Sequence, residues 1–174
     1  MPILGGIPVR QRLTAVGERI VLRAAMWRYP PTTIGGVTYL DLGSSDQERL
    51  VLIPGTVARA LDLIQQTPGE FAEVIAEGLK VVVSVDRLRR SRLLLGVRGY
   101  ISPFEGPERG NEMLLALNLL WCATYCRGYC AAAGARVDVD WSDLERQSSS
   151  LQAAFVRHRP DAGDWLEYLQ RTGR

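Results

Sequence analysis

The feature that most constrains the fold is an apolar run from Glu108 to Ala133, ERGNEMLLALNLLWCATYCRGYCAAA, which contains all three cysteines. Its large residues form two lines at helical spacing. One line contains Met113, Leu114, Leu117, Trp121 and Thr124, and the other contains Leu115, Leu119, Cys122, Cys126 and Cys130. Arg127 is the only charged residue between Glu112 and Arg136, so we predict a long helix that is buried on more than one side. Asn118 interrupts the run, and this polar break favours a core helix over a membrane span.

Composition places the chain among soluble folded proteins. Its 174 residues are enough for one domain with a sizeable core, and 47% apolar and 23% charged residues are ordinary values. The net charge is only +2. Three cysteines at a spacing of four do not make a disulfide framework, and the N-terminus lacks a signal-peptide pattern, so we expect a cytoplasmic protein. We interpret residues 1–174 as a single domain, with 1–10 as a flexible arm and 142–174 as a peripheral helical tail.

The remaining elements are assigned from periodicity and from turn residues. The spacing in residues 9–28 fits a helix or a strand, and periodicity does not decide between them. Predicted strands cover 32–42, 48–53, 80–85, 92–101 and 136–141. Predicted helices cover 56–66, 67–77, the region after Ser142, and 164–171, with the hydroxyl of Thr67 capping the second of them. This order predicts an α+β fold in which a mostly antiparallel sheet packs against the long central helix, with short helices at the C-terminus.

Aromatic and leucine side chains near segment ends are candidates for a protein interface, because large rings with polar neighbours are enriched there. The candidates are Trp27, Tyr29, Trp165, Leu166, Tyr168 and Leu169. The C-terminal segment that holds four of them has too few apolar residues to be stable alone. We expect it to dock on its own core, on another subunit or on a partner.

A basic cluster lies between the predicted strands 80–85 and 92–101. It contains Arg87, Arg89, Arg90 and Arg92, which suggest contact with a nucleic-acid backbone or an acidic partner. The two helices before it would complete a winged-helix arrangement. The second of these helices carries Glu70, Glu73 and Glu77, however, and acidic residues on a groove-facing helix repel phosphate. Nucleic-acid binding is therefore the weaker alternative.

The cysteines offer a different function. The Pro107 loop, the run from Glu112 to Cys122 and the glycine turn before Val137 resemble the OsmC/Ohr family of peroxide reductases. In that family a central helix carries the peroxidatic cysteine, so the resemblance implies a thiol enzyme with Cys122 or Cys126 as the reactive residue. The family has a second cysteine well downstream, whereas this chain has no cysteine after Cys130.

Asp138 and Asp140 would lie on one face of the predicted strand 136–141, where paired carboxylates can hold Mg²⁺ or Mn²⁺. An alternating strand that is exposed on one face explains the same pattern, so we predict no metal site, and the sequence indicates no cofactor. No combination of residues makes a convincing catalytic site. We therefore expect a non-enzymatic interaction or assembly subunit of a soluble complex, with a protein partner or a second copy and no membrane contact. The thiol-dependent peroxide reductase and the basic hairpin are the alternatives.

Overall fold

The computed structural model describes residues 9–42, 47–85, 92–102 and 111–172, with side chains described from residue 16 onward except at 47–52. Its elements are α1 (Val9–Arg28), β1 (Thr32–Ile34), β2 (Val37–Leu42), α2 (Gln47–Gln66), α3 (Phe71–Gly78), β3 (Val81–Val85), β4 (Arg92–Leu94), β5 (Gly99–Ser102), α4 (Glu112–Ala135), α5 (Trp141–His158) and α6 (Gly163–Thr172). The predicted arm 1–10 lies outside the described residues, except for its last two residues, which begin α1.

The α+β prediction is confirmed, and the sheet is mixed rather than mostly antiparallel. Its strand order is β1-β2-β3-β5-β4. The outer pairs are antiparallel, whereas β2 with β3 and β3 with β5 are parallel. Parallel neighbours need a long crossover connection, and α2 and α3 form the one between β2 and β3.

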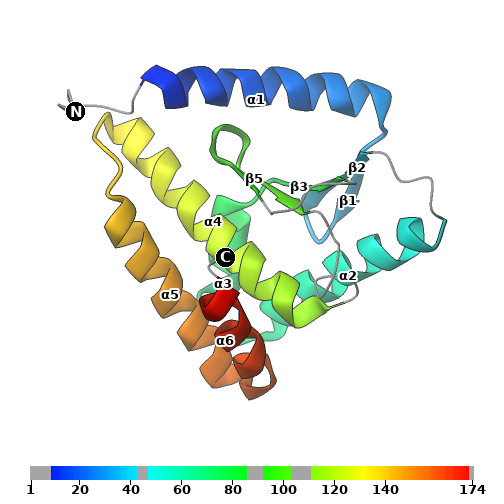
Figure 1. The fold of residues 1–174 in the computed structure, drawn as a ribbon, viewed down its shortest axis with the longest axis vertical. Coiled ribbons are helices and arrows are strands. Elements are labelled where there is room, and N and C mark those ends of the chain that lie inside the picture. The colour runs from blue at the N-terminus through cyan, green and yellow to red at the C-terminus, as the bar shows by residue number, and fades with distance from the viewer. Residues whose placement is uncertain (1–8, 43–46, 86–91, 103–110, 173–174) are drawn as a thin grey trace.

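The two faces of the sheet are covered by different helices (Figure 1). Side chains alternate between the two faces of a strand. Tyr39 and Val82 accordingly belong to a large core that also contains α2, α3 and α4, whereas Leu40 and Val83 belong to a small cluster beneath α1. Figure 1 shows α1 along one side of the molecule and the other helices grouped on the opposite side of the sheet.

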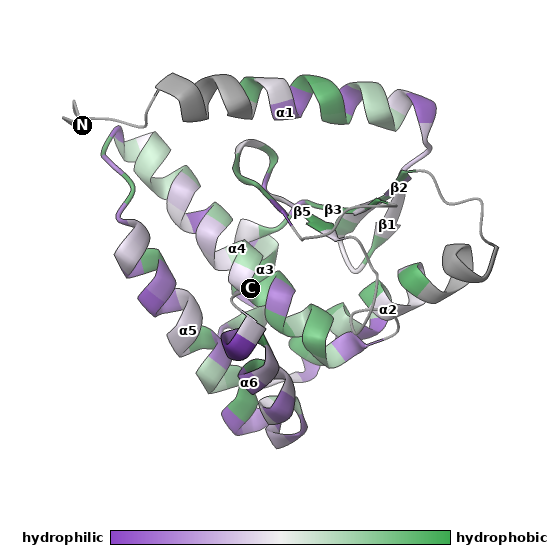
Figure 2. Ribbon diagram, in the orientation of Figure 1, coloured by the Kyte–Doolittle hydropathy of each residue, from purple (hydrophilic) through white to green (hydrophobic). Residues whose placement is uncertain are grey.

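The predicted core helix is confirmed as α4, which packs against α2, α3 and α5. Residues from Leu114 to Leu120 are all buried, in keeping with the apolar lines of the sequence. In Figure 2 hydrophobic residues gather where α2, α3 and α4 meet. Backbones approach closely at Gly78, where an added Cβ would lie 2.0 Å from the carbonyl oxygen of Ala123.

Two helices occupy segments that the sequence left open or misassigned. Residues 9–28 form a helix rather than a strand. Residues 48–53, predicted as a strand, belong to α2, which continues through Pro54. The reason is that Ile53, Val57 and Ile64 keep helical spacing across the proline and are all buried. The core therefore favours one continuous helix over a break.

The predicted strand 136–141 is wrong: residues 137–140 are an irregular connection, and Trp141 begins α5. Both ends of this connection are capped. Arg136 adopts a left-handed conformation, φ 58°, and its backbone N–H closes α4 on the carbonyls of Ala132 and Ala133. A carboxylate oxygen of Asp140 accepts the Asp143 N–H at 2.9 Å and starts α5.

The predicted strand 92–101 is instead a hairpin in which β4 pairs with β5. Between them lie the 3₁₀ turn η1 (Leu95–Val97) and Arg98, which is left-handed at φ 53°. Strand β3 pairs with β5 in parallel. The winged-helix arrangement therefore does not form.

The predicted cap by Thr67 is also wrong. Its hydroxyl donates to the carbonyl of Leu63 at 2.6 Å, and Nε of Arg159 donates to the same hydroxyl oxygen at 3.2 Å. Thr67 thus closes the end of α2 and links it to the end of α5. Helix α3 begins four residues later without a side-chain cap.

Candidate interaction surface

Two hydrogen bonds join helix α1 to Gly96 of η1. The Gly96 N–H donates to a carboxylate oxygen of Glu18 at 2.9 Å, and Nε of Arg19 donates to the Gly96 carbonyl at 3.1 Å. Burial raises the pKa of the Glu18 carboxyl, and the hydrogen bond from Gly96 opposes this increase without cancelling it. Ionisation of the Glu18 carboxyl between α1 and η1 therefore carries a free-energy cost from desolvation.

The sheet face beneath α1 is only partly covered. Leu22, Ala25 and Met26 of α1 pack on the small cluster of Leu40, Val81 and Val83. Beside them remains an open groove of about 370 Å³ in which Glu18 is the only charged residue of the lining. The groove is lined by Gly17, Glu18, Val21, Leu22, Ala25, Leu42, Val83, Leu94 and Ile101.

The opposite side of α1 also carries apolar residues. Val16, Ile20, Arg23 and Trp27 follow one another at steps of four, three and four, so they share one side of the helix, here called the outer stripe. Trp27 is 92% exposed, Ile20 64% and Val16 53%. In Figure 2 green and purple residues alternate along the visible side of α1. A helix that is apolar on both sides and covered on only one side is unusual in a monomer.

The other predicted interface residues lie mainly inside the molecule. Leu169 is buried, and Trp165, Leu166 and Tyr168 are half-buried against the main core. Trp165 and Tyr168 also pack edge to face, with ring centroids 6.1 Å apart. Tyr29, which follows α1, is 37% exposed. Of the predicted interface side chains, only Trp27 is directed mainly to solvent.

A second exposed patch is formed by residues 137–145, here called the acidic segment. Val137 is 52% exposed and Trp141 38%. Trp141 stacks on Tyr125, with ring centroids 6.3 Å apart, and the Tyr125 hydroxyl hydrogen-bonds to Glu145. The indole is therefore held in place before any partner arrives. The signal missed in the sequence was Asp140, whose carboxylate caps the helix that begins at Trp141.

A third feature is a groove of about 510 Å³ between α4 and α5. Arg127, Arg146 and Arg157 line it, which suggests a site for an anion. Two of these guanidinium groups are already paired, Arg127 with Glu77 at 3.5 Å and Arg146 with Asp143 at 3.0 Å. An anionic ligand would have to compete with those carboxylates, so the groove favours no particular ligand.

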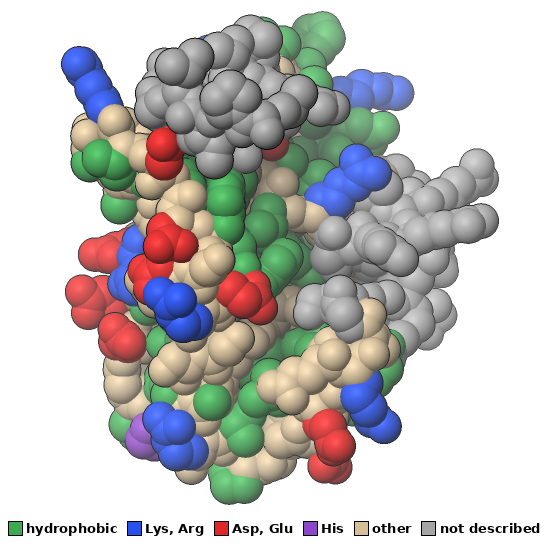
Figure 3. Space-filling view, turned by 60° about the vertical axis from the view of Figure 1, so that its left-hand side comes forward, with side chains coloured by type: hydrophobic (Ala, Val, Ile, Leu, Met, Phe, Trp, Pro, Cys, Tyr) green, Lys and Arg blue, Asp and Glu red, His purple; other side chains and the backbone are tan. Residues whose placement is uncertain are grey.

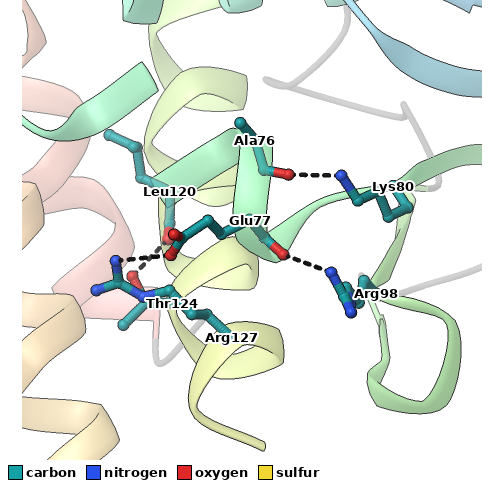
Figure 4. Close-up of polar contacts among 7 residues, drawn as sticks. All are labelled: Ala76, Glu77, Lys80, Arg98, Leu120, Thr124 and Arg127. Atoms are coloured by element: carbon teal, nitrogen blue, oxygen red, sulfur yellow. Dashed lines mark hydrogen bonds and ion pairs between the residues drawn. The ribbon is translucent and has the colours of Figure 1, made fainter. Parts of the chain in front are cut away.

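The basic residues of the predicted hairpin do not form a described surface. Arg87, Arg89 and Arg90 lie outside the described residues, and Arg92 is exposed on the edge strand β4. Other cations gather instead at the end of α3 (Figure 4). Lys80 donates to the carbonyl of Ala76 at 2.6 Å, and Arg98 donates to the carbonyl of Glu77 at 3.0 Å. The two cationic side chains satisfy terminal carbonyl groups of the helix by hydrogen bonding, which is a structural role.

The candidate reactive cysteines are enclosed by the core. Cys122 and Cys126 are fully buried with their sulfur atoms 3.9 Å apart, and the Cys122 thiol faces the carbonyl of Gly99 at 3.5 Å. Burial raises the pKa of Cys122 well above its usual value, and the neighbouring Cys126 adds to this increase. The thiol form is therefore favoured over the thiolate that would attack a peroxide.

Two further findings concern the described part of the chain. Within it, no group of three His, Cys, Asp or Glu residues is arranged to hold a metal ion, so Asp138 and Asp140 do not belong to such a group. None of its helices is both long and apolar enough to cross a membrane. Comparison of the chain with protein-family models, curated proteins and solved structures found no match.

Proposed function

We propose that this protein is a non-enzymatic interaction subunit of a protein assembly, with α1 as its main contact element. The observation that carries the proposal is the outer stripe, in which Trp27 is 92% exposed on a well-formed helix. A tryptophan that is rigidly presented and buried on binding is a typical anchor of protein interfaces. Because α1 is already folded and held at Gly96, a partner would meet an ordered surface and lose little conformational entropy.

The apolar groove beside α1 supports the same proposal. Its lining comes from both α1 and the sheet, so a partner side chain entering it would contact both at once. The alternatives have less support. The two thiols of the peroxide-reductase alternative are buried, and the thiolate form of Cys122 is disfavoured. Most of the basic hairpin lies outside the described residues.

Photo-crosslinking in the cells from which the chain comes tests this proposal. A benzoylphenylalanine would replace Trp27, and a control would carry it at Gln170, which is exposed on α6. We expect one dominant adduct from position 27, and we expect Ile20→Ser in the same chain to remove it. Equal labelling from both positions, or no adduct from position 27, would show that α1 is not a contact element.

A further inference from the structure

In the part of α1 whose side chains are described, the exposed charged residues are all basic. They are Arg19, Arg23 and Arg28. The one acid of this stretch, Glu18, is half-buried, and its carboxylate accepts the Gly96 N–H. Among the described residues no carboxylate lies within ion-pair distance of the three arginines. The solvent side of α1 therefore combines apolar side chains with guanidinium groups that lack an anionic partner in the described part of the chain.

We infer that the partner that covers α1 is an acidic amphipathic helix of a different protein. This inference rests on the proposed function and names the class of its partner. Such a helix carries an apolar row at steps of three and four, with Asp or Glu beside the row. The apolar row would pack on Ile20 and Trp27 of the outer stripe, and a carboxylate would bind the guanidinium of Arg23 through two parallel hydrogen bonds.

The position of Arg23 favours a protein over other anionic surfaces. Arg23 lies inside the outer stripe, between Ile20 and Trp27. If these two side chains entered a lipid layer, the guanidinium would be drawn in with them at a cost in free energy. A nucleic-acid backbone offers phosphates but little apolar surface for Val16 and Ile20. An amphipathic helix offers both, because a guanidinium that is paired with a carboxylate is tolerated inside a protein interface.

The acidic surface of the chain itself does not supply this partner. Figure 3 shows acidic side chains gathered on the side of the molecule where α5 begins. Outside α1 and the adjoining Tyr29, the exposed large hydrophobic residues among those described are Val137 and Trp141, both in the acidic segment. Each carboxylate of that segment already has an interaction within the chain, and these are Asp138, Asp140, Asp143 and Glu145. A second copy would have to give up those interactions, whereas a different protein would not.

The length of the outer stripe sets the strength of the contact. From Val16 to Trp27 the helix rises about 17 Å, which is about three turns. One helix packed along three turns makes an interface at the small end of the observed range, and such interfaces are typical of transient association. Because the arginines are exposed, their attraction to carboxylates is screened by salt. We therefore expect a salt-sensitive contact of moderate affinity.

The test starts from the crosslink at position 27. Peptide mass spectrometry locates the partner segment that carries the benzoylphenylalanine adduct, and a synthetic peptide of that segment becomes the probe. Fluorescence anisotropy then measures binding of the labelled peptide to the purified full chain. We expect a peptide of net negative charge whose dissociation constant rises at least about tenfold between about 50 mM and about 500 mM salt.

Substitutions at Arg23 test the charge pairing directly. Arg23→Glu should weaken binding of the peptide at least about tenfold, and Arg23→Lys should weaken it less because the charge remains. A second peptide, with lysine in place of its acidic residues, should bind Arg23→Glu more tightly than it binds wild type. Arg157→Glu, which is exposed on α5, is the matched control and should leave binding of the first peptide unchanged. Thermal melting followed by circular dichroism checks that each variant is folded.

The possible failures separate the inference from the proposed function. A basic or uncharged segment at the adduct, an adduct on a second copy of this chain, or binding that Arg23→Glu leaves unchanged would overturn the inference while the interaction function stands. An adduct to phospholipid without any protein adduct would place α1 on a lipid surface and overturn both proposals. The absence of any adduct from position 27 would contradict the proposed function itself.

Discussion

The two faces of the sheet are formed by the same strands but are covered very differently. On one face, α2, α3 and α4 exclude water from Tyr39, Val82 and Tyr100. On the other face a single helix covers Leu40, Val81 and Val83 and leaves an open groove beside them. The strands supply apolar side chains to both sides, so the difference arises from the helices. A closed core gives stability, whereas a face that one helix covers only in part is available for binding.

The close backbone contact between α3 and α4 at Gly78 gives the strongest test of this comparison. Gly78→Ala would put a methyl group 2.0 Å from the Ala123 carbonyl oxygen, which is backbone and has no side-chain freedom to move away. Helices α3 and α4 would have to separate. We expect a loss of more than about 4 kcal/mol in the free energy of unfolding, measured by urea denaturation.

A glycine elsewhere on α4 provides the control. At Gly134 an added Cβ meets nothing within 4 Å. Gly134→Ala should raise the free energy of unfolding by up to about 1 kcal/mol, because alanine has the higher helix propensity. A similar loss for both variants would mean that steric conflict at Gly78 is not the cause.

The cysteines on α4 report how well the closed side excludes solvent. Cys122 and Cys126 are buried, and Cys130 on the same helix is half-buried. We expect iodoacetamide to label Cys122 about 1,000-fold more slowly in the folded chain than in urea, because access to it requires unfolding. Cys130 should react before it and serves as the internal reference, with sites located by peptide mass spectrometry. Rapid labelling of Cys122 in the folded state would restore the thiol-enzyme alternative.

A pair of leucines compares the two faces directly. Leu119 in the main core and Leu40 beneath α1 are both fully buried. Leu119→Ala should cost about 3 to 5 kcal/mol, because dense packing on all sides prevents the cavity from closing. Leu40→Ala should cost about 2 kcal/mol, because α1 has room to settle into the space. Chemical denaturation of both variants gives the comparison, and equal losses would show that the α1 side is as tightly packed as the core.

The smallest expected effect concerns the attachment of α1. The pKa of Glu18 is raised above its usual 4.5, so the folded chain binds this proton more tightly than the unfolded chain. Its contribution is therefore fully present below pH 4.5 and is lost as the pH rises through the folded-state pKa. Glu18→Gln keeps a hydrogen-bond acceptor for Gly96 without a charge. We expect it to be slightly more stable than wild type at pH 7.

The control for the Glu18→Gln variant is to repeat the stability measurement over a range of pH. Denaturation midpoints of wild type and Glu18→Gln should converge as the pH falls below 4.5, where the wild-type carboxyl becomes protonated in both states. Glu73→Gln, on the exposed side of α3, should show no such convergence. A Glu18→Gln variant that is less stable at pH 7 would mean that the charge itself holds α1 in place.

By itself the sequence determined the elements whose signals are local or strongly periodic. These are the buried helix α4, whose two apolar lines require a cover on several sides, and the C-terminal helices on either side of Pro160. Residues 32–42 were predicted as one strand, whereas they fold into the antiparallel pair β1 and β2 around Gly35 and Gly36. Only the tertiary structure decided the rest. The run before Pro54 becomes helix because Ile53 completes a buried line, and the segment before Trp141 becomes a connection because Arg136 and Asp140 cap its two neighbours. The interaction surface also had to wait for the tertiary structure, since the exposure of Trp27 and Trp141 depends on which neighbours cover them, and periodicity carries no such information.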